Sequence, residues 1–262
     1  MKLIIMFQDT KKYPASAFFS AENDLSADSN QAPPEKTDSR PDDKNQAAFS
    51  FLHDLLNSAG GLSGFLEMMA ETDDSEKLKK YASNALFLCG SMVEEINSYQ
   101  DFLRAETGTF RLAAEETKVS DILESTALKL KEHDVSKGRT IEVADFPEVS
   151  VLTDKVLLSR VLVNLVKNAV ENTEQGGSVR IGAVKISKAG DNIRFWVRND
   201  GFIPEEIQSR IFSGPFSSKG VNRGIGLSGI RMIGENALGG HVHFKSTKEG
   251  GTCFCIDLPT RE

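Results

Sequence analysis

The chain has 262 residues, of which 39% are hydrophobic, and a formal net charge of −7. This length and apolar content allow two modest domains with cores of their own, and the negative charge argues against a nucleic-acid partner, which requires clustered Lys and Arg. Three cysteines are too few and too unevenly spaced for a disulfide framework, so we expect a reducing, cytoplasmic location.

Residues 1–45 are predicted to form a disordered tail. The apolar start, MKLIIMF, is too short for a signal core or a membrane span. The polar stretch that follows is rich in Ser, Asp, Asn and Pro, and it buries too little surface to offset its ordering entropy. We therefore expect no membrane segment, and an input signal that arrives through the tail, the helices or a separate upstream sensor protein.

Residues 46–108 are predicted to form a helical hairpin. Apolar residues recur at alternating spacings of three and four along 52–69 and again along 78–103, which is typical of packed bundle helices. The polar sequence ETDDS separates the two helices, with Ser75 as the expected cap of the second. One hairpin does not cover both apolar seams, whereas two hairpins related by a two-fold axis close a four-helix bundle, so we predict a homodimer.

The first helix carries a polar patch made of His53, Asp54 and Asn57. His53 lies one position beyond a seam residue, so its ring is expected to project from the outer face of the bundle. A carboxylate bonded to one ring nitrogen fixes the imidazole tautomer and stabilises the positive charge that develops when the other nitrogen attacks. The patch therefore suits phosphoryl chemistry on a histidine, although an adjacent His and Asp alone is more often an ordinary surface pair.

Residues 115–262 are predicted to form an α/β sandwich. Amphipathic patterns predict helices at 119–133 and 152–173, the second capped by Thr153 or Asp154. Strands are expected at 139–145, 178–187, 192–199, 241–246 and 251–258. Strands paired mainly antiparallel, with helices on one face, are the economical arrangement.

Three stretches of this second region indicate a nucleotide site. In NLVKN, Asn164 and Asn168 share one helix face, and amide oxygens suit Mg²⁺, although buried amides that cap a loop are as common. NDGFIPEE, which begins at Asn199, joins a strand end to a helix through a glycine turn. The glycine-rich SSKGVNRGIGLSG precedes a helix and directs backbone amides at phosphates, with Lys219 and Arg223 adding positive charge.

In their order and spacing, these motifs make residues 49–259 resemble the sensor histidine kinases of two-component signalling. In that family a histidine-bearing dimerisation bundle precedes a Bergerat-type ATP-binding domain. HDLLN resembles the histidine box, NLVKNAVEN the asparagine box and NDGFIP the first glycine box. IFSGPFSSKG resembles the phenylalanine box and lid, GIGL the second glycine box, and GGTCF the strand that closes the adenine pocket. The resemblance implies an α+β chain, with a hairpin that dimerises into a four-helix bundle followed by an α/β sandwich.

The resemblance also implies a reaction and a role for each matching residue. His53 is the nucleophile phosphorylated by ATP, Asp54 is its orienting base, and Asn57 helps to position water or an acceptor during dephosphorylation. The phosphoryl group then passes to an aspartate of a separate response regulator, and the chain is also expected to act as a phosphatase of that regulator. The implied ATP-binding residues are Asn164, Asn168, Asn172, Asn199, Gly201, Phe212, Phe216, Lys219, Arg223, Gly224, Gly226, Leu227 and Thr252.

Within this set, the resemblance assigns Mg²⁺ to Asn168 and support of the phosphates to Asn164. Asn199 and Thr252 are implied to contact adenine. Phe212 and Phe216 are implied to anchor the lid, with packing in the core as the alternative for one of them, while Lys219, Arg223, Gly224 and Gly226 close over the triphosphate.

The chain departs from the family pattern at two places. Asn199 stands where the first glycine box has a carboxylate, and the box is one residue and one glycine short. The amide oxygen still accepts from the adenine amino group, but it lacks charge assistance worth roughly 1 kcal/mol. The alternative is that the adjacent Asp200 turns inward in its place. The proline that usually follows the histidine box is replaced by Ser58 and Ala59. We therefore expect this chain to bind nucleotide more weakly than family members that carry the carboxylate. The expected cofactors are ATP and Mg²⁺.

Two other functions share these motifs. ATP-hydrolysing machines of the gyrase or chaperone type carry a glutamate where Asn164 stands, and an amide does not accept a proton from water. The other is a catalytically decayed scaffold that binds a receiver domain without using ATP. A separate hypothesis concerns the last two strands, whose His241, His243, Cys253 and Cys255 are ligand types for zinc, although strand alternation alone also explains their spacing.

Overall fold

The computed structural model describes residues 41–109, 111–131, 136, 138–186, 192–212 and 226–259. Most of the predicted tail, residues 1–40, lies outside this range. Asn45–Glu262 form one compact unit, and the contacts described below lie within it. No helix in the described ranges combines the length and the apolar character needed to cross a membrane.

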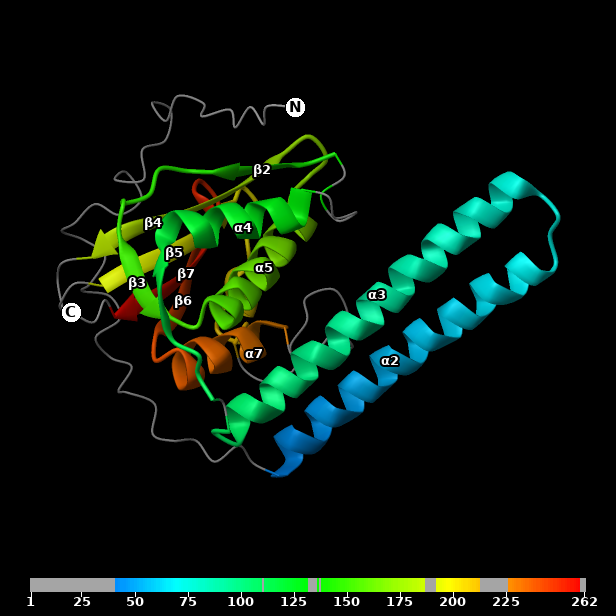
Figure 1. Cartoon of the computed structure of the whole chain (residues 1–262), viewed down its shortest axis with the longest axis horizontal. Helices are drawn as coiled ribbons and strands as arrows, with labels where there is room; N and C mark the ends of the chain where they lie inside the picture. The colour runs from blue at the N-terminus through cyan, green and yellow to red at the C-terminus, as the bar shows by residue number, and fades with distance from the viewer. Residues whose placement is uncertain are drawn as a thin grey trace. The chain divides into compact units, whose positions relative to one another are not determined.

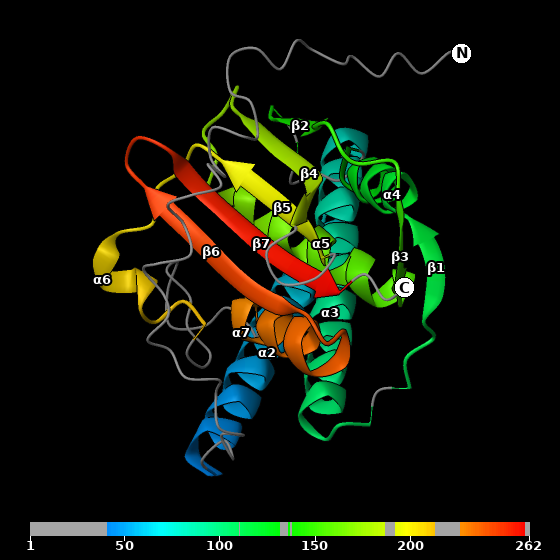
Figure 2. The same cartoon turned by 90° about the vertical axis from the view of Figure 1, so that its left-hand side faces the viewer.

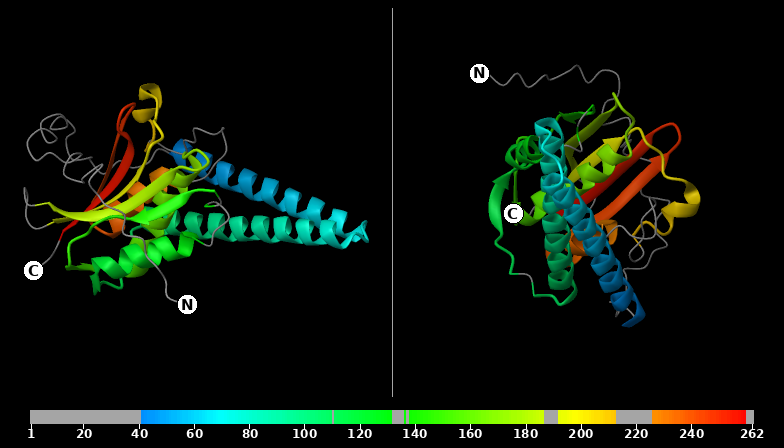
Figure 3. Two further views of the ribbon diagram at one scale, coloured as in Figure 1. Left: turned by 90° about the horizontal axis from the view of Figure 1, so that it is seen from above. Right: turned by 90° about the vertical axis from the view of Figure 1, so that its right-hand side faces the viewer.

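The hairpin consists of α2 (Pro41–Ala70) and α3 (Ser75–Glu106), so its first helix begins within the stretch predicted as tail. The two helices run side by side in Figures 1 and 3. The ring of Phe51 stacks on that of Tyr99 with centroids 4.2 Å apart, and Phe65 lies 6.2 Å from Tyr81. These two pairs join opposite ends of the helices, so the helices are antiparallel.

The prediction that Ser75 caps the second helix was wrong by one residue. Asp74 is the cap, because its backbone is extended and its Oδ1 accepts hydrogen bonds from the amides of Glu76 and Lys77, at 2.9 and 3.2 Å. Ser75 is the first helical residue, where a side chain no longer reaches those amides.

Several apolar residues of the predicted seams are solvent-exposed in the single chain. Leu52 and Leu66 of α2 are 51% and 52% exposed, and Leu103 of α3 is 40% exposed. One hairpin therefore leaves apolar surface uncovered on both helices, as its sequence pattern predicts.

The second region contains a five-stranded sheet in the order β2-β4-β5-β7-β6. These strands are β2 (Thr140–Val143), β4 (Ser178–Ile186), β5 (Asn192–Asn199), β6 (His241–Thr247) and β7 (Gly251–Pro259). β2 pairs with β4 in parallel, and the other pairs in the sheet are antiparallel. A second, two-stranded sheet of β1 (Glu115–Lys118) and β3 (Ser150–Thr153) was not predicted.

Helices cover one face of the five-stranded sheet, as Figure 2 shows. They are α4 (Val119–Lys131), α5 (Lys155–Glu171), and α7 (Gly226–Met232), which continues as the π-helix η3 (Ile233–Ala237). A short helix, α6 (Glu205–Gln208), follows β5. Asp154, one of the two predicted caps, begins α5 by accepting from the amide of Leu157 at 3.0 Å.

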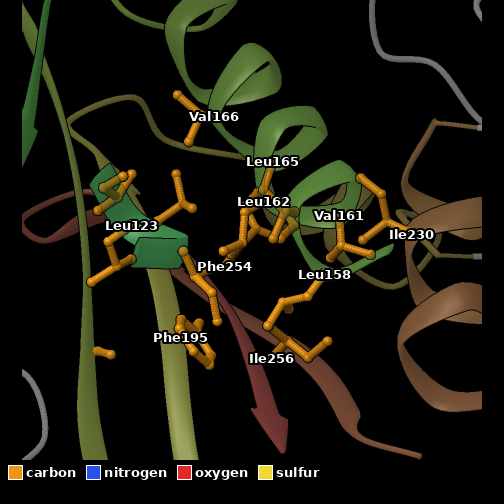
Figure 4. Packing of buried hydrophobic residues seen from close by; sticks show 14 of the residues in the cluster. Leu123, Leu158, Val161, Leu162, Leu165, Val166, Phe195, Ile230, Phe254 and Ile256 are labelled. Carbon is orange, nitrogen blue, oxygen red and sulfur yellow. The ribbon is translucent and has the colours of Figure 1, made fainter. Parts of the chain in front are cut away.

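The core lies between these helices and the sheet. Alternate residues of β5 point inward, and Phe195 among them is fully buried. In Figure 4, Leu158 and Leu162 of α5 point toward Phe254 and Ile256 of β7. The predicted α+β fold, with an α/β sandwich after the hairpin, is therefore confirmed, and its core packs α5 against the sheet.

Candidate functional site

The structure brings His53, Asp54 and Asn57 together on α2. The side chain of His53 is 51% exposed. Its Nδ1 lies 3.0 Å from Asn57 Nδ2 and 3.4 Å from Asp54 Oδ1. A carboxylate only accepts, so a hydrogen bond to Asp54 requires a proton on Nδ1, whereas Asn57 Nδ2 is a donor and, as oriented, favours a lone pair on Nδ1. Turning the Asn57 amide over presents its oxygen and makes both contacts consistent with a proton on Nδ1. Asp54 thus favours the tautomer whose lone pair is on Nε2.

A second group of predicted residues lies at the C-terminal half of α5. Asn164 and Asn168 are half-buried and one turn apart. Asn172 ends the helix, and its Nδ2 donates to the carbonyl oxygen of Asn168 at 2.7 Å. The side chain of Asn172 therefore caps α5, which orders the helix end that carries the other two amides.

The end of β5 lies against this helix end. Asn199 is 4% exposed, and its Nδ2 donates to the backbone carbonyl of Asn172 at 3.3 Å. A Cβ on Gly201 would lie 2.5 Å from that carbonyl oxygen and 2.6 Å from Asn199 Nδ2. Only glycine at position 201 permits this close approach, because any side chain would push the strand end away from the helix.

Thr252 contacts this turn rather than projecting away from it. Its Oγ1 donates to the carbonyl oxygen of Gly201 at 2.7 Å and lies 2.8 Å from Ser246 Oγ. Ser246 Oγ in turn accepts from the amide of Ile203 at 2.9 Å. The hydroxyls of β6 and β7 therefore hold both ends of the glycine turn.

Ser246 was missed by the sequence analysis, although the chain contains a signal for it. It continues the inward-facing alternation of Val242 and Phe244, and it is 8% exposed. A hydroxyl at a buried position of a strand requires a partner, and here the partners are the backbone of the turn and Thr252.

Phe212 lies at the edge of the core. Its ring makes edge contacts with Phe244 and Phe254 at centroid distances of 5.5 and 6.3 Å, and the guanidinium of Arg231 lies 5.3 Å from its centre. This packing corresponds to the core alternative considered for one of the two phenylalanines.

The remaining predicted site residues lie within the stretch 213–225 or directly after it. Gly226 begins α7, and Leu227 packs against the core. Phe216, Lys219, Arg223 and Gly224 lie outside the described residues.

The histidines of β6 pair with carboxylates instead of forming a zinc site with the cysteines. His241 Nδ1 lies 3.5 Å from Glu235 Oε1, and His243 Nε2 lies 3.4 Å from Asp257 Oδ2. The Sγ atoms of Cys253 and Cys255 lie 3.9 Å apart, with both thiols buried. Within the described ranges, no group of three or more metal-ligand side chains is placed to hold an ion.

These residues fit the expected cofactors. The amide of Asn199 at the end of β5 uses its Nδ2 within the protein, and its oxygen is an acceptor of the type that suits the amino edge of a purine. Asn164 and Asn168 supply hard amide oxygens on the adjacent helix, the type that ligates Mg²⁺ or accepts hydrogen bonds from its bound waters. A one-faced sandwich with an asparagine-bearing helix and a glycine turn is a Bergerat-type ATP-binding domain, and here it follows a histidine-bearing hairpin.

Comparison with known proteins agrees with this class. Residues 153–262 match the family described as histidine kinase-, DNA gyrase B-, and HSP90-like ATPase. The sensory/regulatory protein RpfC of Xanthomonas campestris is 28% identical over 233 residues, which cover 82% of this chain and 32% of RpfC. The signal transduction histidine-protein kinase BarA of Escherichia coli is 24% identical over 225 residues, 82% of this chain and 24% of BarA. The chain spans a third or less of the length of these relatives.

Solved structures show the same fold. The Acinetobacter baumannii histidine kinase AdeS superposes with a TM-score of 0.60 at 20% identity, over 80% of this chain and 98% of that one. The histidine kinase ThkA, in complex with the response regulator protein TrrA, superposes with a TM-score of 0.59 at 26% identity, over 80% of this chain and 60% of that one. The chain is therefore similar to histidine kinases over the hairpin and the ATP-binding domain together.

Proposed function

We propose that the chain is a histidine autokinase that transfers the γ-phosphoryl group of ATP to His53. The observation that carries this proposal is the exposed imidazole whose Nδ1 contacts Asp54, in a chain that also holds an ATP-binding domain. With the proton on Nδ1, the lone pair of Nε2 attacks the γ-phosphorus and the bond from that phosphorus to the β–γ bridging oxygen breaks. ADP leaves, and His53 carries a phosphoramidate.

The other site residues orient the two reactants and offset the charges that develop on them. Asp54 stabilises the positive charge that builds on the ring as Nε2 attacks, and it accepts the Nδ1 proton as the charge is released. Asn168 is proposed to hold Mg²⁺, which offsets the charge of the triphosphate, and Asn164 to support the phosphates. At the opposite end of the nucleotide, Asn199 and the turn at Gly201 receive adenine.

The acceptor of the phosphoryl group is proposed to be an aspartate on a separate response regulator, with Asn57 acting in the reverse, phosphatase direction. The complex of the relative ThkA with a response regulator supports this partner. A homodimer is proposed because the exposed leucines of α2 and α3 require a second hairpin to cover them. The free cysteines remain the basis for a cytoplasmic location.

One specific feature favours a second candidate function, a scaffold that binds a receiver domain without using ATP. Asn199 replaces the carboxylate of the first glycine box. The scaffold hypothesis predicts no phosphorylation of His53, so a single assay separates it from the autokinase.

That assay incubates the purified chain with γ-labelled ATP and Mg²⁺. We expect acid-labile, base-stable label on the wild type, none on H53Q, and strongly reduced label on N168A. H241Q is the matched control, since His241 is also an exposed histidine but lies on β6, and it should be labelled like the wild type. Label that survives in H53Q refutes the proposed acceptor, and an unlabelled wild type favours the scaffold.

A further inference from the structure

The amide of Asn199 has its orientation fixed by the end of the neighbouring helix. A backbone carbonyl only accepts hydrogen bonds, so the atom of Asn199 that lies 3.3 Å from the carbonyl oxygen of Asn172 is Nδ2, the donor. The described structure shows no hydrogen bond to the other amide atom, Oδ1. The side chain is therefore a donor toward the protein and an acceptor toward a ligand.

Two further contacts hold this arrangement in place. The capping bond from Asn172 Nδ2 to Asn168 fixes the helix end that presents the carbonyl. Gly201 touches both partners, and a Cβ there would collide with the carbonyl oxygen and with Asn199 Nδ2. Asn199 itself is 4% exposed, so its amide has little room to rotate. The orientation is thus set by the protein before any ligand binds.

We propose that the carbonyl of Asn172 acts as a positioning group that locks Asn199, so that the chain reads its nucleotide through one acceptor, Asn199 Oδ1. This inference rests on the proposed function, because it takes nucleotide binding at this site as given. A locked acceptor pairs with the 6-amino group of adenine and repels the 6-oxo group of hypoxanthine or guanine. A freely rotating amide would accommodate either group by turning over.

The hydrogen bond from Asn199 to Asn172 also reverses the effect on ATP affinity that is expected of a carboxylate at position 199. An ionised carboxylate has no proton to donate, so it would place an oxygen about 3.3 Å from the carbonyl oxygen of Asn172. The repulsion and the lost hydrogen bond displace the side chain from the turn at Gly201. In this chain N199D should therefore weaken ATP binding, even though the family pattern carries an acid there.

The test measures the Kd of the intact chain by calorimetry for ATP and for inosine triphosphate, which differs at the 6-position. We expect the wild type to bind inosine triphosphate at least about tenfold more weakly than ATP, the size of one lost or opposed hydrogen bond. We expect N199D to bind ATP about tenfold more weakly than the wild type at pH 8. Burial at this position and the facing carbonyl raise the pKa of the introduced carboxyl above its ordinary range near 4, so the affinity should approach the wild-type value as the pH is lowered toward 5.5 and the protonated carboxyl donates to Asn172.

N192D is the matched control, since Asn192 lies at the other end of the same strand and the chemical change is identical. It should bind ATP like the wild type at both pH values. An N199D protein that binds ATP as tightly as the wild type at pH 8, or whose deficit does not shrink on acidification, overturns the proposal. If N199D does not fold, the two Kd values of the wild type still test the proposal. Equal affinity for ATP and inosine triphosphate would mean that the Asn199 amide rotates freely, which contradicts it. A wild type that binds neither nucleotide refutes the proposed function instead.

Discussion

The hydroxyl of Thr252 is predicted to support both the stability of the ATP-binding domain and the shape of its glycine turn. Thr252 is 2% exposed, and its Oγ1 donates to the carbonyl of Gly201 at 2.7 Å while lying 2.8 Å from Ser246 Oγ. T252V keeps the shape of the side chain but removes both contacts. Each net hydrogen bond contributes about 1 kcal/mol, so T252V should lower the free energy of unfolding by about 2 kcal/mol.

For a domain of this size, a loss of that magnitude lowers the Tm by about 4–8 °C. Thermal unfolding followed by circular dichroism measures the shift, and calorimetry with ATP measures the effect on the turn. T252S is the control, because it keeps the hydroxyl and loses only a buried methyl group, worth about 1 kcal/mol. T252S should retain wild-type affinity for ATP, whereas T252V should not. If T252V unfolds at the wild-type temperature and binds ATP equally well, the hydroxyl does not support the turn.

Two ion pairs give further predictions. Burial raises the pKa of Asp257, but two hydrogen bonds from Arg194 and the nearby His243 more than compensate and lower it to about 2. Because this pKa is depressed on folding, the pair contributes roughly 2 kcal/mol above pH 4, and the contribution is lost as the pH falls through about 2. Urea unfolding of the wild type and D257N should therefore differ at pH 7 and converge near pH 2; a constant difference contradicts this linkage. Asp101 Oδ2 lies 2.6 Å from Arg160 Nη1, with side-chain exposures of 4% and 48%, and Arg104 Nη1 lies 3.8 Å from Asp101 Oδ1. R160Q leaves the buried carboxylate with this more distant guanidinium, so it should cost more stability in urea unfolding than D101N, roughly 2 against about 1 kcal/mol. The reverse order would show that Asp101 does not depend on Arg160.

The elements with strong periodicity were predictable from the sequence. Both hairpin helices carry long apolar stripes, and β5 alternates through Ile193, Phe195 and Val197, so each pattern extends over enough residues to identify the element. β1 and β3 have four residues each and were missed, because alternation over so short a span does not stand out from loop sequence. The predicted cap of α3 was one residue too late in the chain. Asp74 and Ser75 are both good capping residues, and only their backbone angles show which of them caps the helix.

The site was predictable as a set of residues but not as a set of contacts. Motif order placed Asn168 and Asn199 in one site, and the structure brings the two elements that carry them together. The contact of Thr252 with Gly201 depends instead on the register that sets Ser246 opposite Thr252 across the last hairpin. That register follows from the geometry of the turn between β6 and β7, which sequence alternation does not specify.

The departure at Asn199 shows why a motif position needs its protein neighbours as well as its ligand. From the ligand side alone, an amide in place of a carboxylate loses charge assistance, and weaker ATP binding follows. From the protein side, the carbonyl of Asn172 requires a donor at the same position, which a carboxylate lacks. An amide is the group that donates to the helix end and accepts from adenine at once. The amide therefore keeps a hydrogen bond within the protein that a carboxylate would lose, and the shortened glycine box is compatible with a working nucleotide site.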